Sequence, residues 1–167
     1  VTGVGFAPDF VWLKSRPATS GHNLTNTISG ATKYLRSDLT AAEGTANIVT
    51  AFGSDGFTVG DGNGQDVNKS GESVVAWNWK AGGTAVSNTN GNITSSVSAN
   101  VDAGFSIVSY TGNDNATTNT IGHGLSKAPE IVFSKRRNTG GYHWMVGYNI
   151  DGTAHSLYLN DTFARDN

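Results

Sequence analysis

The stretch "APDFVWLKSR" at residues 7–16 returns almost unchanged as "APEIVFSKRR" at residues 128–137. Five of the ten positions are identical and three more are conservative. Each copy predicts a strand, because proline stands at its start, where the missing N–H does least harm, and apolar side chains follow. These side chains point to both sides of the strand, a pattern typical of the inside of a β-sandwich rather than of a solvated sheet.

The similarity extends outward from the two stretches over about forty residues with one insertion, which predicts an internal repeat of about 120 residues. On this interpretation residues 1–83 are a first sandwich unit that lacks its first strand. Residues 84–103 are a polar linker or an edge hairpin, and residues 104–167 are a second, incomplete copy. We therefore expect the sequence to be a window of a longer polypeptide. The aligned positions are "GVGF" with "GHGL", His22 with His143, Gly30 with Gly152, Leu35 with Leu157, Thr40 with Thr162 and Ala42 with Ala164.

The composition favours strands and tight turns. Hydrophobic residues make up 37% and charged residues 14% of the chain, and Gly, Ser, Thr and Asn supply the difference. The net charge of -2 provides no basic field, so no nucleic-acid partner is expected. The absence of cysteine excludes disulfides and thiol chemistry. No apolar run approaches the roughly 18 residues that would span a bilayer, so we expect no membrane insertion.

Turn signals separate many short apolar runs. Asp55-Gly56 predicts a tight hairpin, and Asn90-Gly91 predicts another between Val86 and Ile93. Short strands with frequent turns predict an all-β fold, specifically a β-sandwich or jelly roll of lectin-like type. The expected strands are 9–15, 46–52, 57–60, 73–80, 92–98, 104–110, 130–136, 143–146 and 155–159.

Two groups of residues are candidates for binding a glycan. Tyr142, His143 and Trp144 lie in a Gly-rich stretch, where Trp144 is the better candidate for an exposed aromatic ring. Asn113 and Asp114 lie in "GNDNATTN", which either presents polar groups to a sugar or forms an ordinary solvated turn.

The tryptophans of residues 73–80 admit two interpretations. Trp77 and Trp79 share one face of the expected strand and could stack on sugar rings. We favour a core position for both, and for Trp12, because their strands are apolar on both faces.

Metal and cofactor chemistry has weak support. Asp61, Asn63, Gln65 and Glu72 match positions 1, 3, 5 and 12 of a calcium loop, but Asp66 occupies the place where the turn needs glycine. An ordinary loop is the preferred interpretation, and no cofactor is expected.

The histidines have no obvious chemical partners in the sequence. His22 and His143 occupy matching places in the repeat, and we expect each to make a structural hydrogen bond. His123, within "GHG", is expected in a turn.

Catalytic motifs are not visible either. The glutamates are Glu43, Glu72 and Glu130, and Glu130 aligns with Asp9 beside a proline, which suggests a structural role. There is no nucleophile elbow, phosphate loop or zinc pattern. We expect no enzymatic activity; a polysaccharide-degrading enzyme, which needs a pair of facing carboxylates, ranks last among the hypotheses.

The set of motifs resembles a repeated β-rich domain of large virion appendage proteins of tailed bacteriophages, including marine phages and cyanophages. The resemblance implies a sandwich of lectin-like or jelly-roll type in a tail fibre, on the virion and outside the cell. It further implies other virion proteins as partners, a homotrimer, and contact with host-surface glycans; a capsid decoration protein is the alternative. The motifs are "PDFVWLKSR", "SDGFTVG", "SGESVVAWNWKAGG", "GFSIVSYTGN", "IGHGLSKAPEIVFSKRR" and "LYLNDT". Ser134 departs from the family pattern, which has an apolar residue there, so this strand is expected to be more polar on its outer face and is a candidate for an edge strand.

Overall fold

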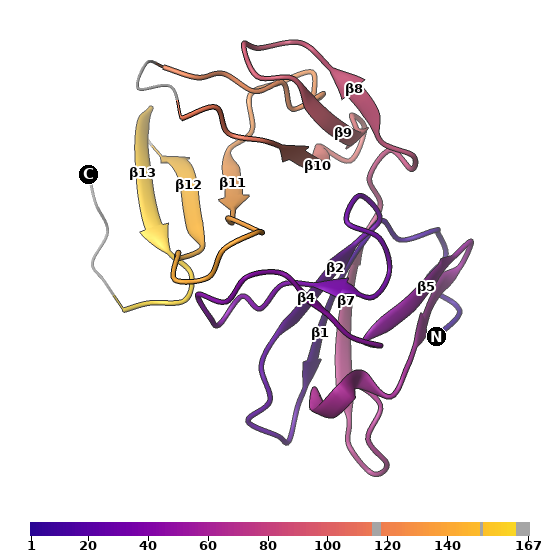
Figure 1. The fold of residues 1–167 in the computed structure, drawn as a ribbon. Coiled ribbons are helices and arrows are strands. Elements are labelled where there is room, and N and C mark those ends of the chain that lie inside the picture. The colour runs from indigo at the N-terminus through magenta and orange to yellow at the C-terminus, as the bar shows by residue number, and fades with distance from the viewer. Residues whose placement is uncertain (115–117, 151, 163–167) are drawn as a thin grey trace.

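The computed structural model describes residues 1–114, 118–150 and 152–162, and these residues form strands and one short 3-10 turn (Figure 1). The all-β prediction is therefore confirmed. The elements are β1 (Phe10–Ser15), β2 (Asn23–Asn26), β3 (Lys33–Tyr34), β4 (Gly44–Thr45), β5 (Val49–Gly53), β6 (Gly56–Val59), η1 (Gly62–Gly64), β7 (Val74–Trp79), β8 (Val86–Asn88), β9 (Ser95–Asn100), β10 (Phe105–Tyr110), β11 (Ile131–Ser134), β12 (Met145–Ile150) and β13 (Thr153–Tyr158).

The described strands form five small antiparallel sheets, none of them closed. Three have three strands, in the orders β2-β1-β7, β10-β9-β8 and β11-β12-β13, and β3-β4 and β5-β6 are pairs. Each range in which the sequence predicted a strand overlaps an observed strand. The sequence pattern missed β2, β3 and β4, because "NLTN", "KY" and "GT" have no apolar alternation and are ordered by their neighbours.

The first sheet packs one face against the β5-β6 hairpin. β1 lies in the centre, with β7 along one edge and β2 along the other. Val11 and Leu13, which are 0% and 2% exposed, meet Ile48, Val49 and Phe57 on this face. The hairpin turns at the predicted place, since Gly53 pairs with Gly56. This pair of layers is the main hydrophobic core of the described chain.

The opposite face of the same sheet is lined with aromatic rings. Phe10 lies edge-on to Trp79, and Trp12 lies edge-on to Trp77 across the strand pair. Phe105 of β10 stacks on Trp79 at 6.2 Å and so connects the second sheet to the first. The core interpretation is wrong for Trp77, which is 45% exposed, because no element within the described residues covers that end of the face.

Residues 84–103 contain a hairpin. β8 pairs with β9 through the register Asn88 to Ser95, and the predicted turn at Asn90-Gly91 lies between them. β9 then pairs with β10 over the six residues from Asn100 to Ser95. Gly91, with φ of 139°, lies so close to the backbone of Thr120 that a Cβ would be 2.5 Å from its carbonyl oxygen. A close approach of two chain segments therefore requires glycine here.

The third sheet repeats the pairing of the first. Val11 of β1 is opposite Thr25 of β2, and Val132 of β11 is opposite Gly147 of β12. The aligned positions are thus 121 residues apart in the first strand and 122 apart in the second. The extra residue falls between His143 and β12, where Trp144 stands.

Further pairs of residues correspond at the same offsets of 121 and 122 positions. Leu24 forms a bridge with Leu35, and their counterparts Val146 and Leu157 are opposite each other in β12 and β13. The backbone bonds from Thr27 N to Asp9 O and from Asn149 N to Glu130 O also correspond, at 2.9 and 3.1 Å. The two quoted stretches therefore pair in the same register with the strand that follows each of them, although β1 is central in its sheet and β11 lies at an edge.

Candidate functional site

Tyr142 presents the exposed aromatic ring of the predicted binding stretch. Its side chain is 48% exposed, and the guanidinium carbon of Arg136 lies 4.4 Å from the centre of its ring. The loop beneath it is fixed, because Gly141 N donates to Thr40 O and Arg137 forms two bonds to the Glu43 carboxylate, at 2.7 and 3.0 Å. A flat ring with an adjacent cation on a fixed loop can contact a sugar by stacking and by hydrogen bonds.

His143 belongs to the end of the third sheet rather than to the exposed surface. Its ring stacks on Tyr158, with the ring centres 4.6 Å apart. Its Nδ1 lies 3.1 Å from the Asn160 side-chain nitrogen and 3.5 Å from the Asp161 carboxylate. The expected structural hydrogen bond is present, but its partners differ from those of His22.

Trp144 is buried, so the expectation of an exposed ring at this position is wrong. It is 6% exposed and packs with Leu24 and Leu35 in a second apolar cluster. Its indole N–H donates to the carbonyl oxygen of Arg36 at 2.7 Å. Trp144 and Val146 are both buried and Met145 between them is 42% exposed, so Trp144 continues the alternation of β12 on its buried side.

Asn113 and Asp114 are exposed, next to residues 115–117, which lie outside the described part of the chain. The Asn113 amide donates to Asn119 Oδ1 at 3.3 Å across this loop. Asp114 has a φ of 52°, a left-handed conformation that aspartate tolerates in turns. This geometry is that of a solvated polar turn, and the glycan role of both residues stays a prediction.

Two of the calcium-loop candidates, Gln65 and Glu72, are bound to cations of the protein. Gln65 Oε1 accepts a bond from Arg36 Nη1 at 2.9 Å, and Glu72 forms an ion pair with Lys69 at 3.6 Å. Asp61 is exposed, and the side chain of Asn63 lies outside what the structure describes. Arg36 and Lys69 therefore already contact side-chain oxygens of Gln65 and Glu72 that would have to bind the metal. Among the described residues no three His, Asp or Glu side chains gather into a metal site.

His22 is part of a polar network that the sequence did not reveal. Its Nδ1 accepts a bond from the Trp12 indole N–H at 2.9 Å, and its backbone N–H donates to Asp38. Burial lowers the pKa of His22, against the opposing effect of Asp38. The network continues to Arg36, whose pKa is raised by its hydrogen bond to Asp38. These partners are separated in sequence by irregular segments, so no spacing pattern could have identified them.

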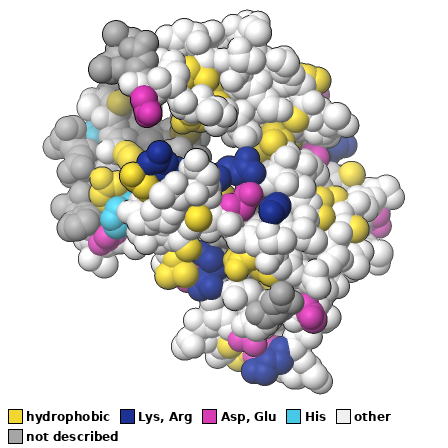
Figure 2. All heavy atoms as spheres, viewed as in Figure 1, with side chains coloured by type: hydrophobic (Ala, Val, Ile, Leu, Met, Phe, Trp, Pro, Cys, Tyr) yellow, Lys and Arg dark blue, Asp and Glu magenta, His cyan; other side chains and the backbone are white. Residues whose placement is uncertain are grey.

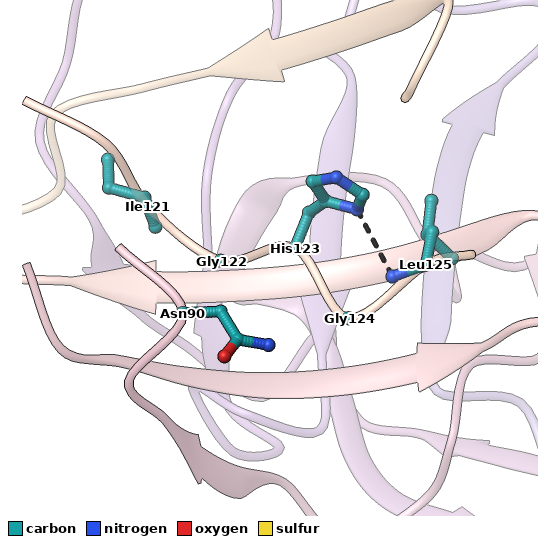
Figure 3. Close-up of a pocket in the computed structure, with 6 residues that line it drawn as sticks. All are labelled: Asn90, Ile121, Gly122, His123, Gly124 and Leu125. Atoms are coloured by element: carbon teal, nitrogen blue, oxygen red, sulfur yellow. Dashed lines mark hydrogen bonds between the residues drawn. The ribbon is translucent and has the colours of Figure 1, made fainter. Parts of the chain in front are cut away.

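A hollow of about 300 Å³ lies between Asn90 and the "GHGL" segment (Figure 3). His123 stands at its centre and accepts a bond from Leu125 N at its own Nδ1, at 3.1 Å, as a turn residue would. The other lining residues are Ile121, Gly122, Gly124 and Leu125. The lining offers one side-chain amide, one imidazole and backbone groups, and no carboxylate or nucleophile.

The remaining carboxylate candidates are spread over the surface. Glu43 is bound to Arg137 and Glu72 to Lys69, while Glu130 is exposed. On the face visible in Figure 2, acidic and basic side chains are interspersed rather than gathered by sign. Among the described residues no helix is long and apolar enough to cross a membrane.

The described residues define an all-β protein of small antiparallel sheets with one exposed aromatic-cation surface. A family model described as a domain of unknown function, DUF7483, matches residues 1–167, so the chain belongs to this family. No curated protein and no solved structure matches the chain.

Proposed function

We propose that the chain is a duplicated, non-enzymatic β module of a phage virion appendage that contacts host-surface glycans. The single observation that carries the proposal is the shared pairing register of the first and third sheets. Two copies of one unit in sequence are typical of proteins that extend along an axis, because each unit contacts mainly its neighbours. The resemblance of the motifs to tail-fibre domains supports this role on the virion.

The finer architecture belongs to the same proposal. In the first unit the β2-β1-β7 sheet faces the β5-β6 hairpin across an apolar layer, which is the arrangement of a small sandwich. We propose that the complete unit is a lectin-like sandwich or jelly roll of about 120 residues. A homotrimer within an appendage, with other virion proteins as neighbours, is the assembly that best suits such an extended module.

We assign the glycan contact to Tyr142 and Arg136, and Asn113 and Asp114, in the loop after β10, stay a separate candidate. Tyr142 offers a flat apolar face that is almost half exposed, and the nearby guanidinium adds hydrogen-bond donors. Trp144 and His143 are not part of this surface, because one is buried and the other is engaged at the end of β13.

Binding to an array of purified bacterial surface polysaccharides tests this proposal. Tyr142→Ala is expected to weaken binding about tenfold, since a stacking contact of one to two kcal/mol is lost. Tyr110→Ala is the matched control, because Tyr110 is 50% exposed on another sheet. Equal losses in both variants, or no polysaccharide binding by the native protein, would contradict the adhesive role.

Labelled antibody on intact virions separates the two virion locations. Binding at the tail supports the appendage role, whereas binding over the head supports a capsid decoration protein. Release of reducing ends from a bound polysaccharide would instead support an enzyme.

A further inference from the structure

β11 exposes three consecutive large apolar residues at the edge of a sheet. Ile131, Val132 and Phe133 are 57%, 48% and 54% exposed, although they point to both faces. Within the described residues no strand pairs with the outer edge of β11, because the sheet order is β11-β12-β13. Proteins usually protect an apolar edge with charges, proline or a cover, since a free edge pairs with other strands. Pro129 and Lys135 flank β11, but Ile131–Ser134 itself carries no charge and no proline, and an exposed apolar run of this kind marks an interaction surface.

The first sheet shows which element covers the corresponding edge. β1 aligns with β11, and its outer edge is paired along its full length with β7. In that register Trp79 is opposite Phe10, and Asn78 is opposite Val11. Val11 is fully buried there, with β7 along the strand edge and the β5-β6 hairpin on the sheet face, whereas its counterpart Val132 is 48% exposed. β1 and β11 thus pair in the same way with the strand that follows each of them, but only β1 has a strand paired along its other edge.

Glu130 supplies an independent sign of the same missing cover. Its counterpart Asp9 is 6% exposed, and its carboxylate accepts backbone N–H bonds from Ala81 and Gly83, at 2.8 and 3.3 Å. Both donors lie in the Gly-rich turn that directly follows β7. The Glu130 carboxylate is exposed and makes no hydrogen bond or ion pair within the described residues. The Glu130 carboxylate is therefore available to accept backbone N–H bonds from a Gly-rich turn, as the Asp9 carboxylate does.

We propose that the outer edge of β11 binds an antiparallel strand of the β7 type. This partner alternates branched aliphatic residues with tryptophan and continues into a Gly-rich turn whose N–H groups bond to Glu130. Its tryptophan nearest the turn lies opposite Ile131, as Trp79 lies opposite Phe10. The inference rests on the proposed duplication and is independent of the proposed glycan role.

The test uses a labelled synthetic peptide with the sequence of residues 73–83, which contains β7 and the following turn. Binding is measured by fluorescence anisotropy, and the site is mapped by NMR on the isotope-labelled protein. We expect saturable binding with shifts confined to β11 and its flanking residues. Glu130→Gln is expected to weaken binding about tenfold, because a charged acceptor of two N–H bonds is lost. A peptide with Ala76→Pro is expected not to bind, since proline interrupts the strand pairing.

Several outcomes would overturn the proposal. Peptide shifts in β1 and β2 would mean exchange with β7, and a β11-mediated dimer seen by sedimentation without peptide would mean that a second copy covers the edge. Absence of binding, or equal binding of the proline peptide, would exclude strand addition. The polysaccharide-binding test on Tyr142 uses no peptide. A failure of the strand-binding proposal can therefore be distinguished from a failure of the glycan-binding proposal.

Discussion

At the scale of single residues, aligned positions have the same backbone role and different surroundings. Asp9 and Glu130 both precede a strand, and both offer their carbonyl oxygen to the next strand. Only Asp9 is buried, where its carboxylate accepts bonds from two backbone N–H groups and from the Thr27 hydroxyl. A charged acceptor in such a site contributes more than a neutral one, because its loss leaves buried donors without partners.

Asp9→Ala is expected to lower the free energy of unfolding by about 1–3 kcal/mol, because the buried N–H of Ala81 and the less buried N–H of Gly83 lose their acceptor. Glu130→Ala is the matched control and is expected to change it by less than about 0.5 kcal/mol, as for other exposed sites. Urea unfolding of both variants measures the difference. Equal effects would show that the Asp9 carboxylate has no special role in fixing the turn after β7.

The His22 and Trp12 pair makes a prediction about pH. Burial lowers the pKa of His22, so the folded state favours the neutral ring, whose Nδ1 accepts the Trp12 indole bond. This stability is fully present above the unfolded pKa of about 6.5 and is lost as the pH falls below it toward the folded pKa. Protonation places a proton on the accepting nitrogen and breaks the bond.

The indole N–H resonance of Trp12 in an NMR titration is expected to shift with a midpoint below about 6.5, the ordinary pKa of histidine. The indole N–H of Trp144 is an internal control, because its acceptor is the Arg36 carbonyl, which does not titrate. A midpoint above the ordinary value, or parallel shifts of both indoles, would contradict this assignment.

At the scale of elements, the β5-β6 hairpin shows how a turn is tied to the rest of the chain. The Asp55 carboxylate at its tip accepts bonds from Gly5 N and Gly3 N, at 2.6 and 2.9 Å, and these bonds lower its pKa. Next to it, Gly56 has a φ of 150°, and an added Cβ would lie 2.2 Å from the Val1 carbonyl oxygen. Backbone approach therefore requires glycine at this position.

Gly56→Ala is expected to reduce stability by about 1–3 kcal/mol, because the backbone conformation is strained for a side chain and the N-terminal segment must move. Gly53→Ala is the control on the partner strand, where the nearest atom would be 3.4 Å away. Thermal unfolding compares the two variants. Identical unfolding temperatures would show that the N-terminal segment can move away from the new side chain without loss of stability.

At the scale of the whole molecule, Trp144 connects the third sheet to the first. Its ring packs on Leu24 and Leu35 and its N–H reaches Arg36, all of which lie more than 100 residues earlier in the sequence. Figure 1 shows the β11-β13 sheet beside the segment that leads from β2 to β4. This contact is one of those that join the third sheet to residues of the first.

Trp144→Ala is expected to lower the free energy of unfolding by about 3–5 kcal/mol, because a large buried ring and its hydrogen bond are lost. Trp77→Ala is the control and is expected to cost much less, since that ring is 45% exposed. Denaturant unfolding monitored by circular dichroism measures both. A smaller effect for Trp144 than for Trp77 would mean that this ring does not stabilise the packing of the third sheet on the first.

Much of the secondary structure and little of the site could be predicted from the sequence. Apolar alternation located β1, β7 and β10, since it reports a half-buried pleated strand directly. The expectation of a buried environment was wrong for β11, because a strand's sequence does not specify the element that covers it, whereas Ser134 correctly indicated an edge strand. The exposure expected for Trp144 was also wrong, because its ring is buried by Leu24 and Leu35, which are distant in sequence.

The sequence by itself determined that this chain is all-β, where its hairpins turn, and which two segments share one pattern. These features follow from side-chain period, from turn residues and from proline, all of which act over a few neighbouring positions. Only the tertiary structure decided which of the similar strands is buried, which tryptophan is exposed and which carboxylate binds a turn. Those outcomes depend on contacts between segments far apart in sequence, where burial removes water and leaves each polar group to find a partner inside the protein.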